Sequence, residues 1–85
     1  MTRYFFDFRD ESGFLEDNEG LDFASLNAAK NEAAQAVASY ARDMVSEDGV
    51  QHLIAVEVRT ASGPSFVTRL QLETITAAGA DSGSR

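Results

Sequence analysis

The chain has 85 residues, with seven basic against fourteen acidic residues, a net charge of −7 and no cysteine. This length allows one domain, and the absence of cysteine excludes a disulfide and, with a single histidine, disfavours a structural zinc site. The negative charge disfavours nucleic acid and anionic membranes as partners and favours basic proteins. No apolar run approaches the ~20 residues of a membrane span and the first residues lack the layout of a signal peptide, so we expect a cytoplasmic protein.

Two strands are predicted before the first helical pattern. Segment 3–9 is rich in aromatic residues and alternates, with one set of side chains facing the core: Tyr4, Phe6 and Phe8. Segment 10–13 is expected to form a turn in which Gly13 takes a positive φ, and segment 14–17 returns as the second strand. Segment 18–24 is expected to be a connector that turns at Gly20.

One long amphipathic helix is predicted over residues 25–47. Ser25 is expected to cap its first turn, and Gly49 is expected to end it. Apolar side chains recur at steps of three or four, which places them on one stripe: Leu26, Ala29, Ala33, Val37, Tyr40 and Met44. We expect the end of this stripe to contact the aromatic face of the first strand.

Two further strands are predicted after the helix, over residues 53–60 and 65–75. Their expected core side chains alternate along each segment: Ile54, Val56, Val58, Phe66, Leu70 and Leu72. The order β-β-α-β-β predicts an α+β fold, a mainly antiparallel sheet with one long helix packed on one face. Residues 1–75 form the single domain, and the polar tail 76–85 is expected to be disordered.

Half of the acidic residues lie between positions 7 and 22, around two glycines. An EF-hand needs an acid five residues before its glycine, and that position holds Phe8 or Leu15. The pattern therefore favours a solvated acidic hairpin over a calcium site. Its candidate partner-binding residues are Asp10, Glu11, Glu16, Asp17 and Glu19.

No catalytic, cofactor-binding or metal-binding residues are predicted. His52 stands alone at the start of a strand, and none of the serines lies in a nucleophile-elbow pattern. Nothing places a carboxylate pair in an apolar pocket that would raise a pKa for acid–base work. We expect a protein that is not an enzyme.

The outward face of the sheet is predicted to carry a basic and partly aromatic group of side chains: Phe5, Arg9, Arg59 and Arg69. Some RNA-binding sheets use such an arrangement. Asp7, Glu57 and Glu73 share this face, so cross-strand ion pairs are the simpler interpretation. Nucleic-acid or small-ligand binding on this face is retained as the least favoured alternative.

Several motifs occur in an order that resembles a known family. The RYFFDFRD opening, the glycine turn, the DNEG segment and the SLNAAKNEAAQA helix resemble a family of short bacterial proteins that is a domain of unknown function, over roughly residues 3–75. This resemblance implies no site residues. More distantly, the acidic glycine turn followed by the helix is similar to the HicB-like antitoxin domain, and nine residues carry the likeness: Asp10, Gly13, Gly20, Ser25, Leu26, Ala28, Ala29, Glu32 and Ala33. This second resemblance implies neutralisation of a basic partner.

A core of this size often supplies only about 3–5 kcal/mol of stability, and neither a disulfide nor zinc is expected to add to it. Association with a second copy would bury exposed apolar side chains and satisfy a sheet edge. We therefore expect a non-enzymatic protein-interaction module that forms a homodimer and uses a sheet edge or the acidic hairpin. The alternative is a HicB-like domain that masks a basic protein.

Overall fold

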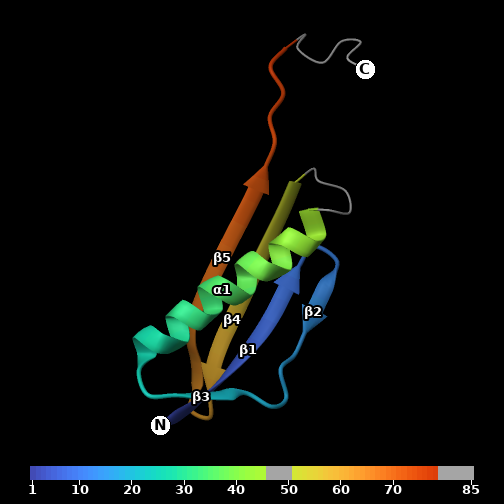
Figure 1. The fold of residues 1–85 in the computed structure, drawn as a ribbon. Helices are drawn as coiled ribbons and strands as arrows, with labels where there is room; N and C mark the ends of the chain where they lie inside the picture. The colour runs from blue at the N-terminus through green and yellow to red at the C-terminus, as the bar shows by residue number, and fades with distance from the viewer. Residues whose placement is uncertain (46–50, 79–85) are drawn as a thin grey trace.

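The computed structural model describes residues 1–45 and 51–78 as five antiparallel strands and one helix (Figure 1). The strand order is β2-β1-β4-β5, and β3 also pairs with β1. The helix packs on one face of the sheet, which confirms the predicted α+β class. The expected helix stop at Gly49 and the tail from residue 79 onward lie outside the described residues, as do the side chains of Met44 and His52.

Strand β1 (Thr2–Asp10) pairs with a return chain that contains two short strands. β2 (Gly13–Leu15) pairs with its end and β3 (Leu21–Phe23) with its start, both antiparallel. The segment expected to be a connector therefore contains a third strand. Its three residues are too few for a two-residue period to be recognised in the sequence.

The turn between β1 and β2 does not use the predicted positive φ at Gly13; the described positive-φ glycines are Gly20 and Gly63. One carboxylate oxygen of Asp10 instead accepts the Ser12 and Gly13 amides at 2.8 and 2.9 Å. This side-chain turn satisfies the backbone without a left-handed residue. The glycine that the local backbone requires is Gly20, where φ is 75°.

Helix α1 (Leu26–Val45) begins as predicted, because Ser25 Oγ accepts the Ala28 amide at 3.1 Å. Ala29 and Ala33 are fully buried, so their small side chains let the helix lie close to the sheet. Leu26, which the stripe placed in the core, is exposed. Ala41, which the stripe omitted, is buried.

Strands β4 (Gln51–Thr60) and β5 (Gly63–Glu73) form a long hairpin. The predicted β4 core residues Ile54, Val56 and Val58 are its most buried side chains, whereas the predicted core residue Leu70 of β5 is exposed because β5 lies at the edge of the sheet. The predicted contact between the end of the helix and β1 is present at Tyr40, whose ring meets that of Phe8 with centroids 5.1 Å apart. Within the described part of the chain, no helix has the length and apolarity needed to cross a membrane.

Candidate functional site

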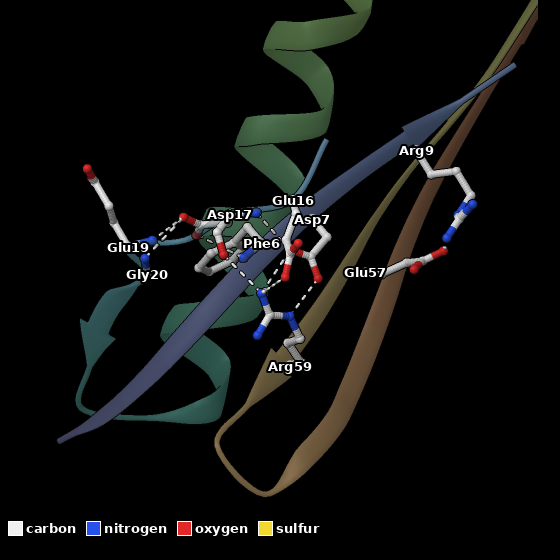
Figure 2. Close-up of polar contacts among 9 residues, drawn as sticks. All are labelled: Phe6, Asp7, Arg9, Glu16, Asp17, Glu19, Gly20, Glu57 and Arg59. Carbon is white, nitrogen blue, oxygen red and sulfur yellow. Dashed lines mark hydrogen bonds and ion pairs between the residues drawn. The ribbon is translucent and has the colours of Figure 1, made fainter. Parts of the chain in front are cut away.

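The polar contacts of the open sheet face converge on Asp7, in the middle of β1 (Figure 2). Asp7 is only 5% exposed although it points away from the helix. One of its carboxylate oxygens accepts the Asp17 amide at 2.9 Å, and the other accepts Arg59 Nε at 2.8 Å. Asp7 thus joins the return chain to β4 across β1.

Asp17 takes the place of a strand partner where the return chain leaves β1. One carboxylate oxygen accepts the Phe6 amide at 3.1 Å, and the other accepts the Glu19 and Gly20 amides at 2.9 and 3.1 Å. Without Asp17 the Phe6 amide would have no strand opposite it, because the return chain pairs with β1 only at Phe8–Asp10 and Thr2–Tyr4. The side chain therefore satisfies the backbone at the interruption.

The interruption also explains Gly20. Between the pairs Phe8–Leu15 and Tyr4–Leu21 the chain advances four positions on β1 but six on the return chain, so the extra residues must turn outward. A Cβ at position 20 would lie 3.0 Å from the Tyr4 carbonyl oxygen, which cannot move without breaking the pairing of β1 with β3. Only glycine fits both this space and the positive φ.

Arg59 closes the network from β4. Besides its bond to Asp7, it donates to the Asp17 carbonyl oxygen at 2.9 Å and to Glu16 at 3.4 Å. The hydrogen bond to Asp7 raises the pKa of the Arg59 guanidinium. Burial opposes the ionisation of Asp17, but the amides of Glu19, Phe6 and Gly20 and the Arg59 charge outweigh it and lower the pKa of Asp17 below its usual value.

Two other candidate acids also contact the chain itself. Asp10 accepts the Tyr40 hydroxyl at 2.7 Å in addition to its turn amides, and these bonds lower the pKa of Asp10 and raise that of Tyr40. Glu11 accepts the Leu53 amide at 3.0 Å. Figure 2 shows the Glu19 carboxylate pointing away from the network. The hairpin acids thus form several separate contacts instead of one cluster.

The predicted sheet-face residues are brought together only in part. Arg9 bonds Glu57 at 2.8 Å and lies 4.4 Å over the Phe14 ring, and Arg59 lies 4.7 Å over the ring of Phe5. Asp7 and Glu57 are direct neighbours in the register, and each meets an arginine diagonally. The expected cross-strand ion pairs are therefore present, and they occupy two of the three candidate arginines. Arg69 lies on the outer strand β5, opposite Ala55.

β5 forms an open edge. The Phe6 amide points toward the return chain and therefore away from β4. Backbone amides of successive residues in a strand point in opposite directions, so the amides of the odd-numbered residues of β1 form the hydrogen bonds to β4. The register pairs odd-numbered residues of β1 with odd-numbered residues of β4, so the even-numbered residues of β4 form the hydrogen bonds to even-numbered residues of β5. The backbone groups left directed at the open edge belong to Val67, Arg69, Gln71 and Glu73.

A groove lies on the other side of the sheet, between the return chain and α1. It encloses about 460 Å³ and is lined by apolar side chains from β1 and the return chain and by Glu32 and Ala36 of the helix. Three of the five candidate acids, Glu16, Asp17 and Glu19, line it as well. The structure therefore assembles part of the acidic hairpin around an apolar surface.

The carboxylates at the centre of the site hold the fold together. Asp7 and Asp17 accept hydrogen bonds from four backbone amides and a guanidinium, which uses their lone pairs within the chain. Among the described residues, no three histidine, cysteine or acidic side chains are grouped as metal ligands would be. The open edge of β5 and the groove are two surfaces of the described residues that these internal contacts leave available.

Sequence reasoning gave Asp7 and Glu57 only the role of countercharges. The signal that could have identified Asp7 is an acid in the centre of an aromatic strand, RYFFDFR, because a carboxylate between large apolar side chains needs fixed donors. The donors lie 10 and 52 positions away along the chain, so their identity was not readable from the sequence.

The comparisons with known proteins identify a family and no activity. No curated protein and no solved structure matches the chain. They therefore give no support to a relation with the HicB-like domain. A family match covers residues 3–71, in agreement with the resemblance to a domain of unknown function. The chain belongs to this family, the domain of unknown function DUF6894.

Proposed function

We propose that this domain is a non-enzymatic protein-interaction module that associates with a second copy of itself through the edge of β5. The observation that carries the proposal is the row of outward-directed backbone groups from Val67 to Glu73 on an eleven-residue edge strand. An open edge of this length is a template for pairing with another strand. The β2 edge of the sheet, in contrast, is a three-residue strand.

The side chains beside this edge are complementary to themselves in one antiparallel register. If Gln71 lies on the two-fold axis, Arg69 faces Glu73 of the second copy and Val67 faces its Ile75. Val67 and Ile75 are 50% and 81% exposed in the single chain, so this pairing removes apolar surface from water. On the helix side, the same register sets Leu70 opposite Leu72 of the second copy.

Neighbouring registers are less favourable. An axis at Arg69 sets two guanidinium groups against each other, and an axis at Leu70 leaves Val67 facing Glu73. The register centred on Gln71 gives opposite charges and apolar pairs together. It would join the two sheets into one continuous sheet with the helices on the same face.

Sedimentation equilibrium at micromolar concentrations tests the proposal. We expect a mass of twice the 9.2 kDa of one chain. Gln71→Pro should give a monomer, because it removes an amide directed at the edge and none that bonds β4. Gln71→Ala is the matched control and should remain dimeric. A wild-type mass of one chain that stays unchanged on concentration would refute self-association.

Charge reversal tests the register. Arg69→Glu should weaken the dimer, because it sets two carboxylates opposite each other, and Arg69→Glu combined with Glu73→Arg should restore it. If both variants dimerise as wild type does, the axis does not lie at Gln71.

The second candidate function is the masking of a basic protein, which the HicB-like resemblance implies. The observation that favours it is the position of Glu16, Asp17 and Glu19 along one apolar groove. Binding of nucleic acid on the open face is the third candidate, and an absorbance ratio typical of pure protein after purification in low salt would count against it. The arginines Arg9 and Arg59 on that face are already paired with carboxylates.

A further inference from the structure

One helix covers only part of its own side of the sheet. α1 packs mainly against β4 and β5, and Figure 1 shows it crossing the sheet diagonally with β2 lying beside it. A helix is roughly 10 Å wide and strands lie about 4.8 Å apart, so one helix covers about two strands. The part that the helix leaves uncovered, above the return chain and the adjacent side of β1, is the apolar groove described above.

The floor of this groove is apolar and continuous across two strands. Leu15 pairs with Phe8 and Leu21 pairs with Tyr4, so both leucines point to the same side as the core aromatics. They are nevertheless 69% and 51% exposed, because α1 leaves them largely uncovered. Two large exposed aliphatic side chains beside a partly buried Phe8 form a contiguous apolar patch, which is typical of an interaction surface.

The rim of the groove is acidic on both sides. Glu32 stands on the helix side, and Glu16, Asp17 and Glu19 stand on the return chain. No lysine or arginine is among the described residues that line it. The Glu16 carboxylate bonds Arg59 and the Asp17 carboxylate feels its charge, whereas the Glu19 side chain points away from that network, so Glu19 and Glu32 leave the rim negative.

We propose that this groove binds an amphipathic helix of a partner protein, one whose apolar stripe is flanked by lysine or arginine. Leucine-sized side chains at helical spacing would contact Leu15, Leu21 and Phe8, while basic side chains would meet Glu19 and Glu32. The proposal rests on the domain being an interaction module, but it uses a surface at the end of the sheet opposite to β5. A dimer formed through β5 would leave both grooves accessible and would bind two such helices.

The test uses the full chain and fluorescein-labelled synthetic helices, with binding measured by fluorescence anisotropy. The first helix carries a leucine stripe with lysine flanks, and the second has the same stripe with glutamate flanks. We expect saturable binding of the lysine helix that weakens as salt is added, and no binding of the glutamate helix. Equal binding of both helices, or binding of neither, would overturn the proposal.

Variants locate the binding surface. Leu15→Ser should weaken binding of the lysine helix by about tenfold, since it removes one apolar contact from the groove. The control is Leu53→Ser, which changes a leucine that is 47% exposed on the open face, and it should bind as wild type does. Equal losses in the two variants would place the peptide elsewhere on the surface.

Glu32→Lys provides a second variant that leaves the apolar floor intact, and it should also weaken binding of the lysine helix. Wild-type binding by this variant would exclude the groove. Sedimentation of the same samples reports dimer formation separately, so a failed groove and a failed dimer give different results.

Discussion

The two sides of the sheet differ in how the backbone groups without a strand partner are satisfied. At the β1 edge the return chain pairs only at its two ends, and the gap is closed by side chains: Asp17 accepts the Phe6 amide, and Asp7 accepts the Asp17 amide. At the β5 edge the strand is regular from Phe66 onward and its outward backbone groups have no such side-chain cover among the described contacts. The gap beside β1 is thereby closed within one chain, and we call this side of the sheet the closed edge; the β5 edge remains available for another chain.

The difference shows how acidic residues can serve two purposes in a small domain. Near β1, Asp7 and Asp17 replace missing strand hydrogen bonds, which uses their carboxylate oxygens within the chain. At β5 the charges of Arg69 and Glu73 lie four residues apart, the spacing that the proposed register would set opposite each other in a second copy. If instead the acids near β1 formed no internal hydrogen bonds and the backbone groups of β5 were bonded within the chain, we would expect a monomer that binds only basic partners.

The largest expected effect comes from opening the closed edge. Asp7→Ala should lower the free energy of unfolding by about 3 kcal/mol, because it leaves the Asp17 amide and the Nε–H of Arg59 without their acceptor and removes the closest carboxylate of that guanidinium. Urea denaturation followed by circular dichroism measures the change. Glu57→Ala is the control: it removes the neighbouring and more exposed acid and should cost much less. Similar losses in the two variants would mean that Asp7 has no special role at this edge.

The next effect concerns the backbone of the same edge. Gly20→Ala should destabilise the domain by about 1–2 kcal/mol, because a side chain at φ 75° is strained and its Cβ would press on the Tyr4 carbonyl. Gly13→Ala should change stability little, since no atom lies within 4 Å of the added Cβ and φ is not positive there. Thermal melts compare the two, and a larger loss at Gly13 would contradict this view of the turn.

Much of the fold was predictable because its signals are local. Alternation in 3–9 and 53–60, the helical stripe and the cap at Ser25 all depend on neighbours within a few residues, and each predicted element is present. β3 was missed because three residues give too short a pattern. Gly13 was assigned the positive φ of a hairpin glycine, while the turn is in fact closed by the Asp10 side chain.

The candidate site was less predictable, because its contacts join distant segments. The acids of the hairpin were identified by composition, but only the structure shows that Asp17 pairs with backbone amides and that Arg59 reaches it from β4. Likewise, the sequence placed Arg9 and Arg59 on one face without showing which carboxylate each would meet. Pairing across strands depends on register, and register was not readable before the structure.

Acid should weaken the closed edge, because protonation of Asp17 removes part of its contribution to stability. The pKa of Asp17 is lowered in the folded chain, so its contribution to stability is present above the unfolded value of about 4 and is lost as the pH falls through the folded value. Asp17→Asn keeps an oxygen that can accept amides but cannot titrate, so its stability should fall less steeply below about pH 4. Urea midpoints measured over this range test the effect, and parallel pH profiles for the two proteins would show that Asp17 does not contribute.

The smallest expected effect is at the open edge, where the chain continues past β5. Truncation after Ile75 should leave the melting temperature within a few degrees and the dimer intact, because residues 76–78 are exposed and the complementary series ends at Ile75. Truncation after Glu73 should also keep the fold, but it removes the side chain that would face Val67 of the second copy and should therefore weaken the dimer in sedimentation. If both truncations dimerise equally, Ile75 has no part in the interface. A large loss of stability after the first truncation would show that the tail docks on the domain.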